Sequence, residues 1–438
     1  MQRVHHKRWI TIFLIGTFLI SSTLLTSLTS AQTSDPLRIQ AEAAILVDAA
    51  SGKILYQKNA DQPLAMASMS KILTEYLILE AIKNQQISWD DTTGISDYAY
   101  RVSQNLALSN VPLRRNEHYT IRELYEAMAI YSANGATIAL AEVLAGSETE
   151  FVRLMNAKAK ALGMENFTFV NATGLNNKDL FGLHPAGAAD AENLASARDT
   201  ALLALRILED YPEVLNFAGI PRKTFRPDTP DAIRMDNWNW MLPELIYGYE
   251  GVDGLKTGST ALAGYCFTAT AQRNGRRLIS VVMKSRSYAD RFQETKKLLD
   301  YGFNNFEQKE LVPAGYQDPE QPSLPVRKGR TNRVGIATAQ PLTLLVRRGE
   351  ADRYQPQVQL ETERLTAPVA KGQEVGRLFA AYTGPNQYEY LTADGPLRES
   401  VALVTTTGVE KAGFFRLIFQ QIGAFFSWLA QQIRGLFS

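Results

Sequence analysis

The sequence predicts an α+β fold, in which helices pack on a mostly antiparallel sheet, followed by a small all-β domain. Strand patterns stand at both ends of one long stretch, over residues 43–56 and 264–283, and the residues between them have largely helical spacing. A proline-rich segment at 310–326 reads as a linker, and short β-rich runs separated by turns follow it over 327–407. A chain of 438 residues has room for both domains.

The elements of the first domain follow in order along the chain. Residues 43–48 predict a strand, 49–52 a turn and 53–56 the returning strand. From Ser68 onward, apolar residues recur at the spacing of a helix. Further helices are expected over 121–144 (with a break at 132–135), 150–162, 197–208 and 291–306, and further strands over 264–270 and 278–283.

The first 31 residues have the pattern of a signal peptide. Basic residues near the start precede an apolar stretch at 9–20, and small residues at 29–31 offer a cleavage point. An uncleaved membrane anchor is the alternative, because apolar residues continue beyond position 20. Both interpretations predict that the remainder of the chain is exported, to the periplasm or the outer face of the cytoplasmic membrane.

The last 30 residues predict an amphipathic helix. On a helix, most polar side chains of 409–438 fall within an arc of about 60°, and the apolar ones cover roughly 200°. Glutamines and arginines interrupt the run too often for a bilayer span, so a helix lying in the membrane interface is expected. A terminal helix packed on the body of the protein is the alternative. The expected organisation is a signal peptide (1–31), an α+β domain (32–310), a β domain (311–407) and an anchor helix (408–438).

Composition excludes several classes of function. The formal net charge of +1 argues against a nucleic-acid-binding protein, which would present a strongly basic face. The four histidines have no metal-ligand spacing, so no cofactor or metal is expected. The one cysteine, Cys266, cannot form an internal disulfide, and its strand-like surroundings predict a buried thiol.

Three short motifs carry the chemistry. They are Ser-Met-Ser-Lys at 68–71, Ser-Ala-Asn at 132–134 and Lys-Thr-Gly at 256–258. Each is weak alone: a helix N-terminus with a solvated lysine, a helix break, or a turn before a strand would explain it. Together they provide a serine nucleophile, an amine base, a polar shuttle and an anion-binding strand.

The context of each motif supports this chemistry. Ser68 stands at the expected start of a helix, so backbone N–H groups point towards its side chain. Lys71 follows one turn later, and it can act as a base if burial and a nearby cation such as Lys256 lower its pKa. Gly258, in a strand-like run, allows a ligand to approach the backbone closely.

The three motifs, in this order, resemble those of the low-molecular-mass penicillin-binding proteins, the serine D-alanyl-D-alanine carboxypeptidases with a C-terminal membrane anchor. Residues 43–59, 171–175 and 251–255 are similar to that family as well. The resemblance implies a penicillin-binding-protein/β-lactamase-like domain followed by the family's β domain. It also implies an acyl-enzyme that β-lactams form, and a stem peptide ending in D-Ala-D-Ala as the substrate.

The resemblance assigns roles to individual residues. It implies that Ser68 is acylated, that Lys71 is its general base and that Ser132 passes a proton to the leaving D-alanine. Arg291 matches a family arginine near the substrate carboxylate less closely, and a surface helix cation is its alternative. The substrate-binding residues that the resemblance implies are Asn134, Lys256, Thr257, Gly258, Ser259 and Arg291, with the oxyanion held by the N–H groups of Ser68 and Ser259.

The sequence departs from the family pattern in places. Met66 stands where many relatives have proline, and Ser259 where they often have His or Tyr. Residues 182–193 and 227–249 are expected to be insertions near the site. The chain lacks the Glu-x-x-Leu-Asn string with which class A β-lactamases deacylate, so slow deacylation after penicillin attack is expected.

Several alternatives stay open. A transpeptidase or endopeptidase could use the same acyl-enzyme, as could a weak β-lactamase. A silent peptidoglycan-binding protein on the same fold is a further alternative, whereas a zinc carboxypeptidase would need clustered His and acidic residues. Binding to a membrane surface through 409–438 is expected, and a homodimer stays open as a further partner.

Overall fold

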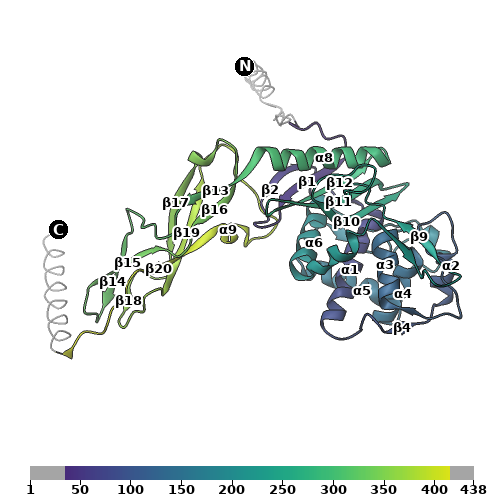
Figure 1. Cartoon of the computed structure of the whole chain (residues 1–438), viewed down its shortest axis with the longest axis horizontal. Helices are drawn as coiled ribbons and strands as arrows, with labels where there is room; N and C mark the ends of the chain where they lie inside the picture. The colour runs from purple at the N-terminus through teal and green to yellow at the C-terminus, as the bar shows by residue number, and fades with distance from the viewer. Residues whose placement is uncertain (1–34, 415–438) are drawn as a thin grey trace, which may run out of the picture. The chain divides into compact units, whose positions relative to one another are not determined.

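A five-stranded antiparallel sheet is the scaffold of the first domain (Figure 1). The computed structural model describes residues 35–414, of which those from Ile39 onward belong to one unit. The strands run in the order β10-β11-β12-β1-β2. Their bounds are β1 Ala43–Asp48, β2 Ile54–Lys58, β10 Val252–Thr260, β11 Gly264–Arg273 and β12 Arg276–Ser285.

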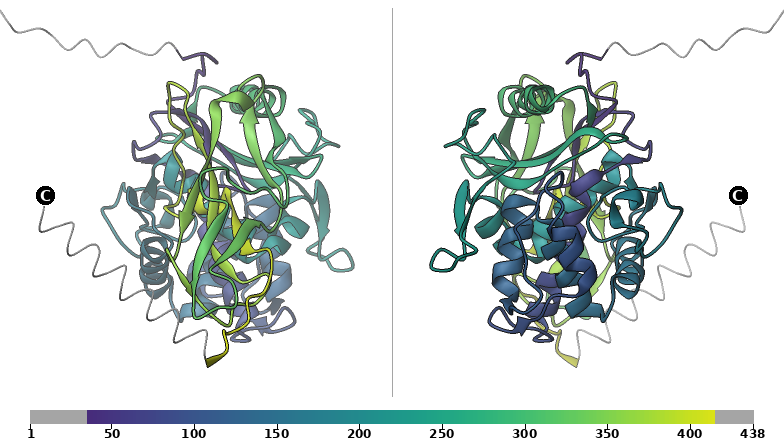
Figure 2. Two further views of the ribbon diagram at one scale, coloured as in Figure 1. Left: turned by 90° about the vertical axis from the view of Figure 1, so that its left-hand side faces the viewer. Right: turned by 90° about the vertical axis from the view of Figure 1, so that its right-hand side faces the viewer.

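Helices cover both faces of this sheet. Helix α8 (Tyr288–Asn305) packs on β11, β12 and β1, and α6 (Ala197–Asp210) packs on the same strands (Figures 1 and 2). In the figures α8 lies on one side of the sheet and the other helices on the opposite side. All six residues of β1 are therefore buried, which explains why its first five residues form a continuous apolar run rather than an alternating pattern.

The helical part corresponds closely to the predicted order. Helices α3 and α4 occupy the stretch expected to be broken, and the break is confined to Ser132 and Ala133. Thr120 and Glu123 form a capping box that fixes the start of α3. The bounds are α1 Lys71–Lys83, α2 Asp97–Ser103, α3 Ile121–Tyr131, α4 Asn134–Ala145, α5 Glu148–Ala161 and α7 Leu215–Ala218, with short 3₁₀ helices η1 Ala67–Ser70, η2 Asn177–Leu180 and η3 Pro212–Val214.

The segments that connect the helices of this domain form three further small sheets within the described residues. One has the order β3-β7-β6, one pairs β4 with β5, and one is the hairpin β8–β9. Strand β9 and most of the turn before it lie in the second predicted insertion, whereas β8 precedes it. The bounds are β3 Leu64–Ala65, β4 Thr92–Thr93, β5 Tyr119–Thr120, β6 Phe167–Thr168, β7 Leu194–Ala195, β8 Arg222–Phe225 and β9 Ile233–Asp236.

The second domain is mostly β, as predicted, but it begins earlier than the composition suggested. Strand β13 (Phe306–Val312) follows α8 directly and pairs with β16 (Leu342–Arg347). The proline-rich segment is therefore not a continuous linker, since its two ends are strands. A six-stranded sheet has the order β17-β19-β20-β15-β14-β18. Its bounds are β14 Ser323–Arg327, β15 Arg333–Thr338, β17 Tyr354–Leu360, β18 Leu365–Thr366, β19 Glu374–Tyr382 and β20 Ser400–Thr405, with short helices η4 Ala351–Arg353 and α9 Gly395–Arg398.

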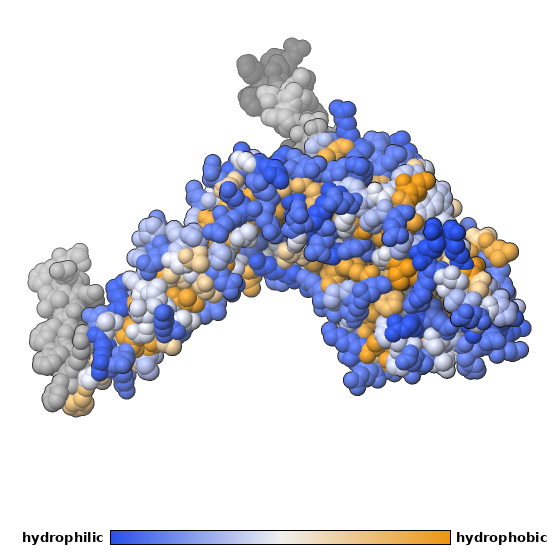
Figure 3. Space-filling model, viewed as in Figure 1, coloured by the Kyte–Doolittle hydropathy of each residue, from blue (hydrophilic) through white to orange (hydrophobic). Residues whose placement is uncertain are grey.

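The two predicted terminal segments lie mainly outside the described residues. Signal-peptide residues 1–31 are all outside them, as are residues 415–438 of the expected anchor helix. The first residues of that expected helix are extended instead, because Val409 bridges to Val369 and Lys411 to Gly329. Within 35–414, no helix has the length and apolar character needed to cross a bilayer. The face of residues 35–414 drawn in Figure 3 is largely hydrophilic, with smaller apolar areas.

Candidate active site

Ser68 lies on a tight turn between strand β3 and helix α1. The turn is the 3₁₀ helix η1, which continues directly into α1. Ala67 has a φ of 48°, a conformation that is rare for a residue with a side chain. Such strain persists only where the surroundings hold it, and β10 packs against η1.

Two glycines provide those surroundings. A Cβ on Gly258 would stand 2.7 Å from the carbonyl oxygen of Met66 and 2.9 Å from the backbone nitrogen of Ser68. A Cβ on Gly174, whose φ is +80°, would stand 1.9 Å from the carbonyl oxygen of Ala67. The sequence predicted that Gly258 allows a ligand to approach. The structure shows that the chain's own serine turn already occupies the space beside it.

Lys71 has its amine fully occupied by three oxygen atoms. Its Nζ lies 3.0 Å from Ser68 Oγ, 2.8 Å from Asn134 Oδ1 and 2.7 Å from the carbonyl oxygen of Thr173. The last two atoms can only accept hydrogen bonds, whereas the serine hydroxyl can also donate. A neutral amine has two N–H groups and one lone pair, so in that state its lone pair faces the Ser68 hydroxyl.

Burial favours this neutral state. Lys71 is completely buried, and burial lowers its pKa well below the ordinary lysine value, with Lys256 as the next cause. Lys256 is also buried, and burial lowers its pKa to about 8. Both lysines therefore ionise less readily than exposed lysines, and Lys71 has the character of a base.

Ser132 and Asn134 come from the break between α3 and α4. Ser132 ends α3 with a φ of 61°, and its buried Oγ has no hydrogen-bond partner among the described residues. Asn134 donates from Nδ2 to the carbonyl oxygen of Ser109, which directs its Oδ1 to Lys71. A strained serine with a free hydroxyl is available to exchange a proton with a bound molecule.

Arg291 is not a surface cation, so that alternative is wrong. It is 1% exposed, and its Nη1 donates to the carbonyl oxygen of Gly258 over 3.4 Å. The guanidinium also lies over the rings of Tyr288 and Phe292. Burial lowers its pKa to about 10, so it remains cationic at neutral pH.

These elements meet at one cavity of about 380 Å³. Lys71 and Lys256 are not among the residues that line it. Its lining contains every other predicted site residue: Ser68, Ser132, Asn134, Thr257, Gly258, Ser259 and Arg291. No Asp or Glu occurs in this lining, which is formed entirely by described residues.

The cavity also has walls that the sequence did not predict. Residues 106–109 and Leu175 contribute to one part, and Tyr131, Trp238 and Tyr288 add aromatic rings. The Trp238 indole donates to the carbonyl oxygen of Tyr131 over 3.2 Å and stacks near Tyr288. Trp238 lies in the predicted insertion at 227–249, which was the one signal in the sequence that pointed to it.

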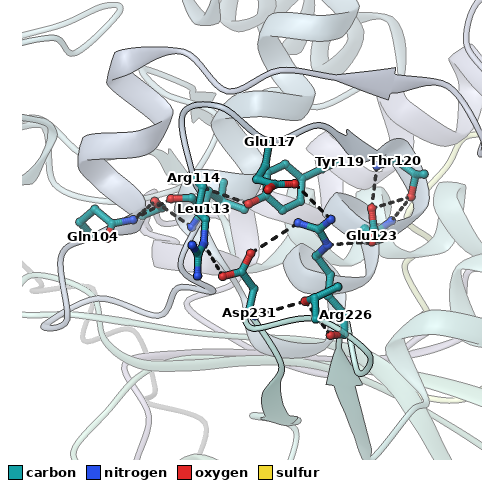
Figure 4. Close-up of polar contacts among 11 residues, drawn as sticks. Gln104, Leu113, Arg114, Glu117, Tyr119, Thr120, Glu123, Arg226 and Asp231 are labelled. Carbon is teal, nitrogen blue, oxygen red and sulfur yellow. Dashed lines mark hydrogen bonds and ion pairs between the residues drawn. The ribbon is translucent and has the colours of Figure 1, made fainter.

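A polar network joins the hairpin β8–β9 to residues 114–123, which follow the wall residues 106–109 in the chain (Figure 4). Arg226 lies over the ring of Tyr119 and faces three carboxylates, those of Glu117, Glu123 and Asp231, at 3.4–3.5 Å. Arg114 pairs with the same Asp231 at 2.5 Å. The network therefore joins the hairpin before Trp238 to the loop after residues 106–109.

Cys266 is buried, as predicted. Burial raises its pKa to about 11, and it lies on β11 rather than in the cavity lining. Nothing in its surroundings therefore suggests a reactive thiol.

Comparisons with known proteins agree with this arrangement. The sequence profile of the family described as D-alanyl-D-alanine carboxypeptidase matches residues 29–287. A second profile, described as penicillin-binding protein 5, C-terminal domain, matches residues 306–411.

Individual relatives match over nearly the whole chain. The D-alanyl-D-alanine carboxypeptidase DacF of Bacillus subtilis is 32% identical over 417 residues, which cover 94% of this chain and 98% of the relative. DacC of Escherichia coli, also a D-alanyl-D-alanine carboxypeptidase, is 33% identical and covers 89% of each chain. The crystal structure of PBP3 from Streptococcus pneumoniae, a peptidoglycan synthesis regulatory factor, superimposes with a TM-score of 0.73 at 35% identity, over 85% of this chain and 100% of that one.

Proposed function

The chain belongs to the D-alanyl-D-alanine carboxypeptidase family, and from that membership we propose that Ser68 is the nucleophile with which it removes the terminal D-alanine from peptidoglycan stem peptides. The chain is a serine hydrolase of the low-molecular-mass penicillin-binding type. The observation that carries the role of Ser68 is the contact of its Oγ with the buried amine of Lys71, at 3.0 Å.

The acylation step uses the residues around the cavity. Lys71 Nζ takes the proton of the Ser68 hydroxyl as Oγ attacks the carbonyl carbon of the D-Ala–D-Ala bond. The N–H groups of Ser68 and Ser259 stabilise the oxyanion, and Arg291 and Thr257 receive the terminal carboxylate. Lys256, which directly precedes Thr257 on β10, adds a positive charge that attracts the same carboxylate.

Release of D-alanine requires a proton on the leaving amine. Ser132 is suited to pass it, because its hydroxyl lines the cavity and has no other partner among the described residues. The C–N bond breaks, an ester between the peptide and Ser68 Oγ remains, and water then hydrolyses that ester.

The test is release of D-alanine from a pentapeptide ending in D-Ala-D-Ala, with wild type compared with Ser68→Ala. Wild type is expected to release D-alanine and the variant none. A wild type that releases none would contradict the carboxypeptidase assignment, and an equally active variant would contradict the role of Ser68. Addition of a D-amino acid acceptor separates hydrolysis from transfer.

β-Lactams are expected to acylate Ser68 and to remain attached. Penicillin-binding protein D2 from Listeria monocytogenes, 34% identical to this chain, has a crystal structure in an ampicillin-bound form. A carboxylate that could activate water, as in a class A β-lactamase, is not among the cavity residues described. Mass spectrometry is expected to detect a lasting penicillin adduct on the peptide that contains Ser68. Rapid penicillin turnover with no adduct would contradict this expectation.

We also propose that the enzyme acts outside the cell, at the membrane surface. The patterns of residues 1–31 and 409–438 support this, as does a substrate that belongs to the cell wall. Fractionation of cells expressing the chain with and without residues 415–438 tests it. The truncated form is expected to leave the membrane fraction, and its retention there would contradict an anchor.

A further inference from the structure

One buried carboxylate near the catalytic lysines has no role in the mechanism above. Glu75 lies on α1, one turn after Lys71, and is 2% exposed. Its Oε1 has no hydrogen-bond partner among the described residues. A buried carboxylate with an oxygen atom that accepts no hydrogen bond is costly unless a nearby cation compensates it.

Lys71 cannot be its hydrogen-bonded partner. The three positions of the Lys71 amine are already occupied by Ser68, Asn134 and the Thr173 carbonyl oxygen. Lys256 is different, because the only hydrogen bond of its amine in the described structure is a long one of 3.5 Å to the carbonyl oxygen of Thr257. Glu75 and Lys256 lie on two elements, α1 and β10, that pack against each other. Each is the main charged group that shifts the pKa of the other towards its ionised form.

The causes of the pKa shifts of Glu75 and Lys256 agree with this pairing. Lys256 affects the pKa of Glu75 more than Lys71 does, although burial is the largest cause and raises it to about 7. Glu75 is in turn the main charged group that raises the pKa of Lys256, against burial and Arg291, which lower it. Lys71 also lowers the pKa of Glu75, and Glu75 and Glu148 oppose the lowering of the Lys71 pKa by burial. Glu75 in turn adds to the burial that raises the pKa of Tyr125, on α3, well above its usual value.

We infer that Glu75 is a positioning residue for the reaction: its carboxylate is the counter-ion that keeps Lys256 protonated, so that of the two lysines Lys256 carries the positive charge and Lys71 is the free base. The inference rests on the proposed function. It explains how two buried lysines of the same site hold different protonation states. The charge on Lys256 then attracts the substrate carboxylate and suppresses protonation of Lys71.

The sign of the pH effect follows. Lys256 is protonated below its pKa of about 8, and activity falls as pH rises through that value. Glu75→Gln removes the negative charge, which lowers the pKa of Lys256 further. The basic limb of the activity profile therefore moves to lower pH.

The experiment uses the full chain and two measurements across a range of pH. One is the rate of acylation by a penicillin, and the other is kcat and KM for release of D-alanine from the pentapeptide. For Glu75→Gln we expect the basic limb to move down by about one unit, which is a tenfold loss of rate above the limb, together with a higher KM for the anionic substrate. Glu80→Gln is the matched control, because Glu80 lies on the same helix but pairs with Lys158 outside the site. Its profile is expected to coincide with that of wild type.

A second measurement does not depend on the variant folding. The ¹³Cε shifts of labelled lysines in the wild-type chain, assigned with Lys71→Arg and Lys256→Arg, are expected to report Lys256 charged and Lys71 neutral at pH 7. The reverse assignment would overturn the inference, as would a Glu75→Gln profile that loses rate equally at every pH. A wild type that neither releases D-alanine nor reacts with penicillin would instead overturn the proposed function.

Discussion

Gly174 and Gly258 determine the position of Ser68, because each lies against the backbone of the turn that carries it. No other residue could approach the carbonyl oxygens of Met66 and Ala67 so closely. The loop that contains Gly174 also contacts Lys71, because the carbonyl oxygen of Thr173 accepts a hydrogen bond from the Lys71 amine. Asn171 shapes this loop by accepting hydrogen bonds from the N–H groups of Thr173 and Gly174.

Gly174→Ala is therefore expected to destabilise the protein and to abolish acylation by penicillin. The new methyl group would collide with Ala67 at 1.9 Å and would stand at a positive φ, so a loss of about 3 kcal/mol is expected. Chemical unfolding and labelling with a fluorescent penicillin measure the two effects. Gly146→Ala is the control, because Gly146 has a similar φ of +77° but no atom within 4 Å of the new Cβ. Equal losses in the two variants would show that backbone conformation alone, not crowding at Ala67, is responsible.

Lys71→Arg is expected to fold but to react with penicillin at least about 10²-fold more slowly. A guanidinium does not lose its proton at accessible pH, so it cannot take the proton of Ser68. Stopped-flow measurement of acylation, with the unfolding transition as a check on folding, tests this. Acylation within tenfold of the wild-type rate would exclude Lys71 as the base.

At the scale of elements, the hairpin β8–β9 supports one wall of the cavity. It precedes Trp238 and is held by Arg226 to the segment that follows residues 106–109 (Figure 4). Phe225 and Met235 anchor the hairpin in the hydrophobic core, and the Phe225 ring stacks on Tyr119. The ion pairs of Arg226 and its contact with Tyr119 add a polar restraint on the turn between the two strands.

Arg226→Met is expected to lower the free energy of unfolding by about 2 kcal/mol, because it leaves several acidic side chains without a half-buried cation. It is also expected to raise KM severalfold with a smaller effect on kcat, since the wall moves but Ser68 and Lys71 stay in place. Arg222→Met is the matched control in the same hairpin. Its arginine is about half exposed and pairs only with Asp236 among the described residues, so a change below about 0.5 kcal/mol is expected. Equal effects of the two substitutions on KM would contradict the role of the network.

At the scale of the whole molecule, Lys53 links the catalytic and β domains within one unit. It is 1% exposed, and its Nζ lies 2.7 Å from Glu399 and 3.2 Å from the carbonyl oxygen of Leu345. The rings of Tyr354, Tyr388 and Tyr390 surround the ammonium group. The β-bridge between Lys53 and Tyr390 adds a backbone contact at the same point.

Lys53→Met is expected to cost about 3 kcal/mol, because Glu399 is left as a buried charge without its partner. The double variant Lys53→Met/Glu399→Gln is expected to recover a substantial part of that loss. Denaturant unfolding of the wild type, the two single variants and the double variant gives the coupling energy. Strict additivity of the two single effects would show that the ion pair does not link the domains.

Much of the fold could be predicted because its periodicities are local. The strands at 43–56 and 264–283 and the helices around 121–162 follow from the spacing of apolar residues, and the structure confirms them. The start of α8 was predicted three residues too late, because the first turn of that helix is polar and Ser287 caps it through a side-chain hydrogen bond. The expected linker was partly wrong, since proline is tolerated at the ends and edges of strands.

The candidate site was less predictable. The three motifs indicated the chemical groups, and the structure brings them together around one cavity. The aromatic wall and Glu75 carry no comparable signal. Trp238 lines the cavity because the hairpin that precedes it packs on residues far away in the sequence. Glu75 has the sequence pattern of an ordinary helix residue.

Residue types at short, fixed spacings were enough to indicate the family and the proposed nucleophile and base, because three local motifs carry them. Only the packing of the folded chain shows that Lys71, Lys256 and Glu75 are all buried and that Arg291 is buried at the cavity. Such properties depend on burial and on the distances between charges from different elements. Burial and distance are set only when α1, β10 and α8 pack together.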